Sequence, residues 1–600
     1  MSEHRNATLA RALTAHDAGD LTQAQAIYRS LLASEPSDFQ PNFFLALATM
    51  QLGVHADAAD LLSRSLSVGP SDSGAWNYLC LAKLELNDAL GAAVAGGRSA
   101  VCEELSEDAH YNLGVALRAS HDHASAIDSF LKAATLNPGA WKTFTNLGLC
   151  YRALNESLLG QAALLKAICT APLEIGPRFN LGALLQERGA LVEALEMYAS
   201  TCDCIRLHDP RHAHLADVFR NRGIVLTTMG RPEEGRRWLS KSICLAPAAV
   251  LCLNNYGNSL KETASLAEAA AAYERALIID PGHAEALWNK ALLLLLTGKI
   301  GEGFKLYESR WRIPELFPSM REFASPRYRG CEPVSGRHIF LYAEQGLGDT
   351  MQFSRFSRRL VELGAKVTLE VPDALMGLMR QSNVASEVVR RGEVEPTADF
   401  QCPLMSLPAA WSLDEAALNM SGPYLFATPD RVFKWSEIIA RDIDVLNVGI
   451  CWRGSARYRG DATRSFGPER FTSLARRPDI VLYSLQQSDA LEQARLAELG
   501  IAYFDEDFDS DGAFLDSIAI LEHLDLVITS DTAIAHLAAA AGKATWILLA
   551  HVPDWRWMLD RNFSPWYPTV RLFRQSSPGD WEAVFLEVER ALTEWPRRSG

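Results

Sequence analysis

The chain has 600 residues, of which 48% are apolar and 22% are charged, and its formal net charge is −15. This length exceeds what a single hydrophobic core supports, so several domains of ordinary globular composition are expected. The acidic balance argues against a general nucleic-acid-binding protein, because neutralising phosphates requires a basic face.

The apolar residues form no run that approaches the roughly 18 to 20 residues of a membrane span, so no integral membrane segment is expected. The first residues lack the basic and then apolar order of a secretory signal. Of the eleven cysteines, only Cys202 and Cys204 lie close together. A C-x-C pair without further ligands favours buried thiols over a metal site. We therefore expect a reducing, cytoplasmic location and no metal.

Small residues recur every 34 positions in the first half of the chain, which predicts tetratricopeptide repeats. Each such repeat has two helices that pack closely at the small residues, and a proline ends the second helix. We expect about nine repeats over residues 6 to 315. The first register holds Gly114, Gly148, Gly182, Gly223, Gly257 and Ala291, and the second holds Ala24, Ala58, Ala92, Ala126, Gly160 and Ala194.

The interval between Gly182 and Gly223 is 41 residues instead of 34. The additional residues fall in the segment 202–210, which ends in Asp209 and Pro210. We interpret this segment as a lengthened turn between two helices.

An asparagine lies two positions before the small residue in six repeats. Stacked repeats of this kind form a concave groove that holds a peptide or helix of another protein. The asparagines are therefore candidates for a ladder of amides that binds an acceptor backbone, although they could instead cap or solvate each repeat. They are Asn112, Asn146, Asn180, Asn221, Asn255 and Asn289.

Beyond residue 336 the pattern changes to short apolar runs that alternate with amphipathic segments, which predicts parallel βα units. Helices are expected over 350–360, 430–442, 532–541 and 581–592. The segment 420–426 divides this half into two lobes, which form a cleft at the carboxyl ends of their strands. The expected strands are 339–343, 366–371, 447–452, 480–485, 526–529, 545–549 and 570–573.

The first candidate loop, Glu344-Gln-Gly-Leu-Gly-Asp349, follows the first of these strands. It lacks the third glycine of a dinucleotide fingerprint and the Lys-Ser/Thr of a P-loop. Gly346 and Gly348 allow the backbone to approach a ligand closely. Asp349 either caps the following helix or points into the cleft.

The second candidate loop brings Ser530, Asp531, Thr532 and Ala533 to the start of a helix. Free N–H groups and the helix dipole favour a phosphate at that place. His536 lies four residues after Thr532 and so shares its helix face. A single helical histidine is more often packed than catalytic.

The third candidate loop, residues 451–464, contains four arginines and one acid in an otherwise acidic protein. Arginine suits phosphate because its planar fork donates two hydrogen bonds at once. We expect an anion-binding loop in which Ser455 takes part. The arginines are Arg453, Arg457, Arg459 and Arg464.

An aromatic loop at 552–568 follows the strand after the helix of His536. Such a loop walls a sugar, stacks on a base or seals the contact between two lobes. Its residues alone do not rank these three readings.

Taken together, these motifs resemble one bacterial family. It joins tetratricopeptide repeats to a GT-B glycosyltransferase domain of the heptosyltransferase-like kind, and it includes flagellin glycosyltransferases. The layout is also similar to that of the O-GlcNAc transferases. The matching motifs are Gly303-Phe-Lys-Leu-Tyr-Glu-Ser-Arg-Trp311, Glu344-Gln-Gly-Leu-Gly-Asp349, Ser530-Asp-Thr-Ala-Ile-Ala-His536, and Asp554-Trp-Arg-Trp557 with Ser564-Pro-Trp-Tyr-Pro568.

The resemblance implies roles for particular residues. Asp349 becomes the general base that deprotonates an acceptor hydroxyl, and Thr532 and His536 bind the phosphate side of the donor. His536 is also expected, with Asp349, among the catalytic residues. Arg453 and Arg464 compensate the charge of the departing nucleotide, so no metal is expected. Direct displacement by a hydroxyl activated at Asp349 would invert the anomeric centre. Ala533 stands where the heptosyltransferase motif has glycine, which leaves the donor open.

The expected fold is thus a tetratricopeptide superhelix followed by two facing Rossmann-like lobes. The predicted function is O-glycosylation of a protein, with flagellin as the first choice of acceptor and a nonulosonic acid in CMP-activated form as a candidate donor. No cofactor is expected, because the nucleotide sugar is a substrate. The alternatives are a transferase acting on a saccharide, or a scaffold with an inactive transferase domain. The expected domains are 1–315 (repeats), 316–336 (connector), 337–430 (acceptor-side lobe) and 431–600 (nucleotide-side lobe).

Overall fold

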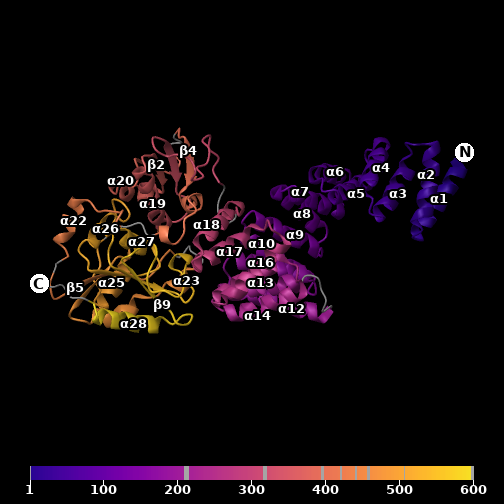
Figure 1. Cartoon of the computed structure of the whole chain (residues 1–600). Helices are drawn as coiled ribbons and strands as arrows, with labels where there is room; N and C mark the ends of the chain where they lie inside the picture. The colour runs from indigo at the N-terminus through magenta and orange to yellow at the C-terminus, as the bar shows by residue number, and fades with distance from the viewer. Residues whose placement is uncertain are drawn as a thin grey trace. The chain divides into compact units, whose positions relative to one another are not determined.

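The structure is a computed structural model that describes residues 2–208, 215–314, 320–393, 397–418, 422–439, 442–455, 460–505 and 507–595. The chain divides into two compact units, Met1–Leu245 and Ala246–Gly600. The first unit consists of helices, and the second contains further helical hairpins and two parallel sheets (Figure 1).

The first unit is built from consecutive helices that pack in antiparallel pairs. The pairing explains the period of 34, because each small residue of a first helix faces a large residue of the second. A Cβ atom at Gly114 would lie 2.6 Å from the Phe130 ring, and one at Gly182 would lie 2.7 Å from the Tyr198 ring. The helices are α1 (Ser2–Asp17), α2 (Leu21–Ser34), α3 (Phe39–Gln51), α4 (His55–Val68), α5 (Ser73–Glu85), α6 (Ala89–Cys102), α7 (Glu107–Ala119), α8 (His123–Leu136), α9 (Trp141–Ala153), α10 (Ser157–Thr170), α11 (Ile175–Glu187), α12 (Leu191–His208), α13 (Leu215–Thr228) and α14 (Pro232–Leu245).

The extra residues before Gly223 lengthen a helix. The prediction of a lengthened turn over 202–210 is wrong for its first seven residues, because α12 continues to His208. Cys202 is buried on this helix and packs in the core of the unit. Packing of Cys202 in this core stabilises a helix that is longer than the second helices of the other repeats. Asp209 and Pro210 lie outside the described residues.

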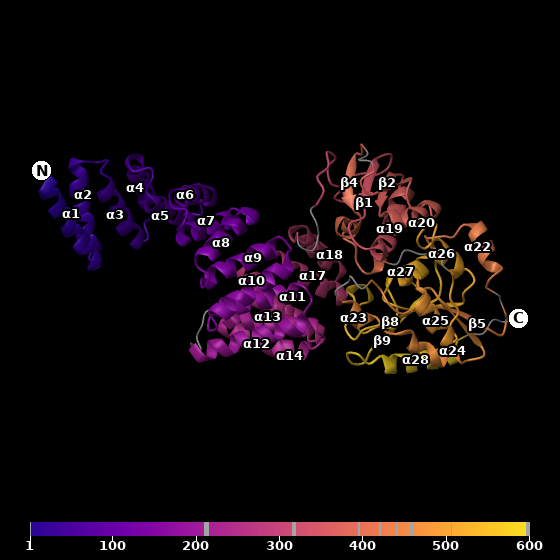
Figure 2. The same ribbon diagram turned by 180° about the vertical axis from the view of Figure 1, so that it is seen from behind.

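The second unit begins with two more hairpins of the same kind. In it, Gly257 faces Tyr273 as Gly182 faces Tyr198, with a Cβ atom placed 2.5 Å from the ring. Figures 1 and 2 show α17 and α18 beside the two sheets. The elements are α15 (Val250–Glu262), α16 (Leu266–Ile279), α17 (Ala284–Leu296), α18 (Ile300–Tyr307) and the 3₁₀ helix η1 (Glu308–Arg312).

The first sheet has the strand order β3-β2-β1-β4 among the described residues, and all of its pairs are parallel. Its central strand places Ile339 beside Val367 on one side and Phe400 on the other. The elements are β1 (His338–Tyr342), α19 (Leu347–Glu362), β2 (Lys366–Val371), η2 (Asp373–Leu375), α20 (Met376–Gln381), β3 (Glu387–Arg390), β4 (Phe400–Pro403), η3 (Leu404–Ser406), α21 (Leu407–Ala410) and η4 (Ala416–Leu418).

The second sheet has the order β6-β5-β7-β8-β9, again with parallel pairs. Its order changes direction at β5, which has β6 on one side and β7 on the other, and ligands bind at such switch points. The elements are α22 (Pro429–Ser436), β5 (Leu446–Cys451), α23 (Asp461–Arg464), η5 (Pro468–Phe471), α24 (Thr472–Ala475), β6 (Ile480–Ser484), α25 (Ala490–Glu498), α26 (Leu515–Leu521), β7 (Leu526–Ser530), α27 (Ala533–Ala540), β8 (Thr545–Leu549), η6 (Trp555–Trp557), β9 (Val570–Arg574) and α28 (Trp581–Thr593).

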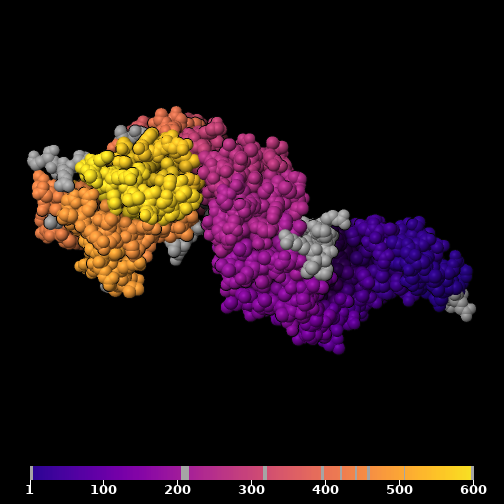
Figure 3. All heavy atoms as spheres, turned by 90° about the horizontal axis from the view of Figure 1, so that it is seen from below, coloured from indigo at the N-terminus to yellow at the C-terminus, as the bar shows by residue number. Residues whose placement is uncertain are grey.

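The main core of the second unit joins its three parts. One cluster of buried side chains includes Leu295 and Phe304 of the last hairpin, Phe353 of α19, and Trp555 and Trp566 of the second lobe. A separate cluster lies under α28 on the other face of the second sheet. Figure 3 shows the C-terminal segment that includes α28, drawn in yellow, at the surface of that lobe.

The predicted superhelix followed by two Rossmann-like lobes is confirmed by these elements. The predicted helix over 430–442 is shorter in the structure, because α22 ends at Ser436, and Ala440 and Arg441 lie outside the described residues. The helix expected from residue 350 begins earlier, at Leu347.

Candidate functional site

A cavity of about 710 Å³ lies in the second unit, at the carboxyl ends of β1, β5 and β7. Both lobes and the last helical hairpin contribute to its wall. Its lining residues include Trp288, Leu292, Tyr307, Gln345, Gly346, Gly348, Asp349, Arg453, Ser455, Arg464, Gln486, Phe514, Asp531, Thr532, Ala533, His536, Asp554, Trp555 and Arg556.

Asp349 both caps a helix and lines the cavity, so the two positions considered from the sequence are not alternatives. It is the third residue of α19, and one carboxylate oxygen accepts a hydrogen bond of 2.8 Å from the Gly346 N–H. The other oxygen accepts a hydrogen bond from the guanidinium of Arg556 in the second lobe. The carboxylate is therefore fixed at the contact between the lobes.

Arg556 lies at the centre of this contact and is 7% exposed. Its Nε donates to the side-chain oxygen of Gln352 at 2.7 Å, and its Nη1 donates to Asp554 at 2.9 Å. The guanidinium also lies 4.2 Å from the centre of the Trp555 ring. Of the three readings of the aromatic loop, this geometry shows that its Trp555–Trp557 segment joins the two lobes.

The start of α27 forms the opposite wall of the cavity. Thr532 is its N-cap residue and Ala533 its first residue. The Thr532 hydroxyl lies 3.2 Å from that of Thr529 and 3.7 Å from the thiol of Cys451, so this side chain links β5 and β7. The N–H groups of the first turn have no partner within the helix, as at any helix start. Ser530 is fully buried and does not line the cavity.

His536 reaches the cavity from one turn further along α27. Its Nδ1 lies 3.1 Å from the Tyr567 hydroxyl, and its ring stacks on Trp557 with the centroids 5.3 Å apart. Burial, with nearby Arg556, lowers the pKa of His536 well below its ordinary value, so the imidazole is neutral near pH 7. A Cβ atom at Gly348 would lie 2.8 Å from the His536 ring. A side chain at this position of α19 would therefore force α19 or the His536 ring to shift.

The two arginines of the arginine loop that the structure describes, Arg453 and Arg464, both line the cavity. Arg453 donates to Glu492 of α25 at 2.6 Å. Arg464 donates to the backbone oxygen of Asp531 at 2.7 Å and to the Asp461 side chain at 3.2 Å. Ser455 also lines the cavity, whereas Arg457 and Arg459 lie outside the described residues. The positive charges of Arg453 and Arg464 are thus balanced by Glu492 and Asp461, of which Glu492 is distant in the sequence.

Asp531 and Asp554 bring two carboxyl groups to the same wall. Burial, together with the charge of Asp554, raises the pKa of Asp531 to about 6. Asp531 therefore changes its charge near neutral pH. Sequence reasoning placed Asp531 among the phosphate-binding residues and gave Asp554 no role of its own, although Asp554 begins the recognised Asp554–Trp557 motif.

The last hairpin contributes residues that sequence reasoning missed. The Trp288 ring of α17 packs on Tyr307 with the centroids 4.5 Å apart. The Tyr307 hydroxyl accepts a hydrogen bond of 3.0 Å from the Gln345 side chain. Leu292 lies one turn after Trp288 on the same face of α17. The repeat pattern of Trp288 gave no sign of this contact.

The six asparagines are all half-buried. Three of them donate a hydrogen bond to the first helix of the preceding repeat: Asn112 to Asn77 at 2.9 Å, Asn146 to the Tyr111 hydroxyl at 3.3 Å, and Asn289 to Asn254 at 3.0 Å. Asn221 instead donates to the Tyr198 hydroxyl of α12 at 3.3 Å. These amides therefore link neighbouring helices, a role that sequence reasoning did not consider. Asn180 and Asn255 occupy the equivalent places on α11 and α15.

No helix among the described residues combines the length and the apolar character needed to cross a membrane. Within the same residues, no group of three or more His, Cys, Asp or Glu side chains is arranged to hold a metal ion.

Comparison with known proteins identifies the repeats. A tetratricopeptide-repeat model matches residues 9–75 and 257–314, and a second one matches residues 107–139. Protein FlbA of Caulobacter vibrioides is 26% identical over 510 residues, which cover 80% of this chain and 83% of that protein. The BBSome complex member bbs-4 of Caenorhabditis elegans is 22% identical over 233 residues, which cover 38% of this chain and 49% of that protein.

Among solved structures, the APC/C hetero-tetramer Cut9-Hcn1 is 14% identical with a TM-score of 0.36, over 46% of this chain and 52% of that chain. YrrB, described as a tetratricopeptide-repeat protein with an unusual peptide-binding site, is 22% identical with a TM-score of 0.27, over 32% of this chain and 97% of that chain. The protein is therefore a tetratricopeptide-repeat protein with a C-terminal α/β region of two parallel sheets, distantly similar to Protein FlbA.

Proposed function

We propose that this protein is a glycosyltransferase that moves a sugar from a nucleotide-activated donor to a hydroxyl group of a protein. The observation that carries the proposal is the cavity between two parallel-sheet lobes, in which Asp349 of the first lobe faces the start of α27 in the second. A carboxylate and an anion-binding helix start on opposite walls suit a reaction between a hydroxyl group and an activated phosphate ester.

The donor phosphate binds at the start of α27. The N–H groups of the first turn and the helix dipole attract an anion there. Arg464 and Arg453 supply the balancing charge. Because the Arg453 side chain is 48% exposed, exchanging Glu492 for a phosphate has a small energetic cost.

The acceptor hydroxyl lies next to Asp349. Its oxygen forms a bond to the anomeric carbon while the bond from that carbon to the donor phosphate oxygen breaks, and the electron pair leaves with the nucleotide. The hydroxyl proton passes to the Asp349 carboxylate. Attack from the side opposite the leaving group inverts the anomeric centre.

Arg556 orients the Asp349 carboxylate before the reaction. Each carboxylate oxygen accepts one hydrogen bond, from Gly346 or Arg556, and retains a second lone pair for the acceptor. The neutral imidazole of His536 adds no charge to this wall and packs against Gly348. These contacts hold the two lobes together at the cavity.

The acceptor is a protein because the site is continuous with a repeat array. Trp288 and Leu292 line the cavity from α17, and Asn255 and Asn289 belong to the same two hairpins. Tetratricopeptide repeats bind peptides or helices of other proteins. Flagellin is our first choice of acceptor, and the family resemblance favours a nonulosonic acid as the sugar.

The proposal is tested with purified protein, unglycosylated flagellin and a CMP-activated nonulosonic acid. The intact mass of flagellin should rise by whole sugar units, and Asp349→Asn should slow the transfer by roughly 100-fold or more. CMP binding by the variant should stay within about twofold of wild type, since Asp349 does not contact the nucleotide. Full transfer by Asp349→Asn would show that another group accepts the proton.

A further inference from the structure

The last repeat ends in an arginine that is completely buried. Arg310 lies in η1, directly after α18, and its side chain is 0% exposed. Its guanidinium lies 4.9 Å from the centre of the Tyr307 ring and 4.4 Å from that of Trp311. A buried charge is costly unless it is paired and hydrogen-bonded, so the partners of Arg310 decide its role.

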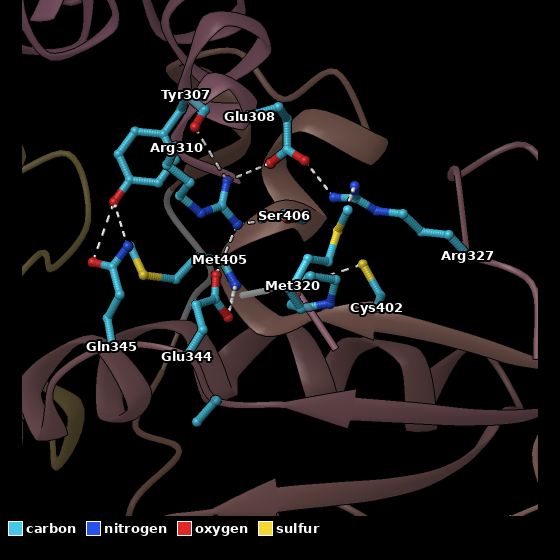
Figure 4. A network of polar contacts seen from close by, with 12 residues as sticks. Tyr307, Glu308, Arg310, Met320, Arg327, Glu344, Gln345, Cys402, Met405 and Ser406 are labelled. Carbon is cyan, nitrogen blue, oxygen red and sulfur yellow. Dashed lines mark hydrogen bonds and ion pairs between the residues drawn. The ribbon is translucent and has the colours of Figure 1, made fainter. Parts of the chain in front are cut away.

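These partners belong to the first lobe as well as to the repeat (Figure 4). Arg310 donates to Glu344 at 2.8 Å and to the Ser406 hydroxyl at 2.7 Å, both in the first lobe. It also donates to Glu308 at 2.6 Å, and Glu308 accepts a further hydrogen bond from Arg327. Two arginines and two glutamates thus form one neutral network.

Glu344 connects this network to the residues that line the cavity, which begin at Gln345. It is the first residue of the Glu344–Asp349 loop and its side chain is 7% exposed. Burial raises the pKa of Glu344, and the guanidinium of Arg310 opposes that rise. The next residue, Gln345, is held by Tyr307 of the repeat, and Gly346 is bonded to Asp349. A continuous series of contacts therefore runs from η1 to Asp349.

We propose that Arg310 is a positioning residue of the proposed transferase, which fixes the Glu344–Asp349 loop through Glu344 and so sets the place of the Asp349 carboxylate. The last helical hairpin is then a working part of the site, in addition to any role in binding the acceptor. This inference rests on the proposed function, in which Asp349 accepts a proton.

The variants must separate position from stability. Arg310→Met alone leaves Glu344 buried without its cation, which destabilises the fold. Arg310→Met combined with Glu344→Gln removes both charges, while Glu308 keeps Arg327 as its partner. The double variant should fold, yet its loop lacks the ion pair. Arg321→Met combined with Glu370→Gln is the matched control, because it removes both charges of a second ion pair with a fully buried glutamate in the same lobe.

The first readout is hydrogen exchange of the amides of 345–349 in the full chain. In the double variant we expect exchange about tenfold faster than in wild type, with α27 unchanged. The second readout is flagellin glycosylation, for which we expect kcat to fall at least about tenfold while CMP binding stays within twofold. The control variant, Arg321→Met with Glu370→Gln, should change neither readout.

Wild-type exchange and wild-type kcat in a stably folded double variant would overturn the role of Arg310. The two proposals fail separately. If the wild-type protein transfers no sugar, the proposed function fails, while faster exchange of 345–349 in the double variant still shows that Arg310 positions the loop.

Discussion

Gly348→Ala tests whether the close contact between the lobes is needed for function. Gly348 lies in the first turn of α19, where alanine is otherwise a favourable residue. A Cβ atom at this position would lie 2.8 Å from the His536 ring and 3.6 Å from the Cα of Ala533. The added methyl group therefore meets α27, which forms the opposite wall of the cavity.

The magnitude follows from how little the neighbours can yield. Carbon atoms that touch without strain are roughly 3.5 to 4.0 Å apart, so the His536 ring must retreat by more than half an ångström. The ring is held by Trp557 and by the Tyr567 hydroxyl and cannot rotate away freely. Overpacking of this kind costs about 1 to 3 kcal/mol. The alternative is a slight separation of the lobes, which moves Asp349 away from Thr532.

Thermal unfolding and sugar transfer measure the two consequences. We expect a lower unfolding temperature and at least a tenfold loss of transfer, since small displacements of reacting groups slow a reaction strongly. Gly301→Ala in α18 is the control, because a Cβ atom there would have an ordinary contact of 3.5 Å with the Leu413 backbone. Wild-type stability and transfer for Gly348→Ala would refute the close packing of α19 on α27.

Three further changes test other parts of the site. Asp531→Asn should stabilise the fold increasingly from pH 4 to pH 7. Burial beside Asp554 raises the pKa of Asp531 from 3.8 to about 6, so the folded state retains a proton that the unfolded state has lost, and ionising Asp531 in the folded state costs at most about 3 kcal/mol. Unfolding curves that shift equally at every pH would contradict this. Arg464→Ala should weaken CMP binding by about tenfold or more, as expected for a lost charge-assisted hydrogen bond. The control Arg477→Ala should leave CMP binding unchanged, because the Arg477 side chain pairs with Asp479. Equal CMP binding by both variants would exclude Arg464 from the phosphate site. A chain of residues 246–600 should keep CMP binding while one of residues 316–600 should lose it, because the shorter chain lacks Leu295 and Phe304, which pack with Trp555 in the core that the hairpin shares with both lobes; CMP binding by 316–600 would show that the last hairpin is dispensable for that step.

The repeats and most strands could be predicted because their signals are local and periodic. Pairs equivalent to Gly182 and Tyr198 recur at a constant spacing, because in each hairpin a small residue of the first helix packs against a large residue of the second. The strands that were missed, β3 (Glu387–Arg390) and β4 (Phe400–Pro403), have four residues each and too few apolar side chains for a period to show. The extended α12 was missed because the acidic and polar residues after Cys202 are typical of a turn.

The site was predicted in part. The loops that carry Asp349, Thr532 and Arg464 follow buried strands, and the carboxyl ends of parallel strands meet at one edge of a sheet. The partners of these residues could not be predicted, because they come from distant segments. Glu492 reaches Arg453 from another helix, and Arg556 reaches Asp349 from the other lobe.

The last hairpin shows the same limit in a different form. Its sequence carries the repeat pattern, and that pattern accounts for Gly303 and Tyr307 as packing residues. Nothing in it distinguishes Arg310, which pairs with Glu344 only after the first lobe has folded against the hairpin. The expected boundary at residue 315 therefore separates Arg310 from Glu344, although the two residues belong to one hydrogen-bonded network.

The most direct test of the account is the intact mass of flagellin from otherwise identical cells with and without this gene. The account predicts that flagellin loses one or more whole sugar masses when the gene is deleted, and that the gene restores them whereas its Asp349→Asn form does not. Flagellin of unchanged mass in the deletion strain would contradict the proposal that flagellin is the acceptor.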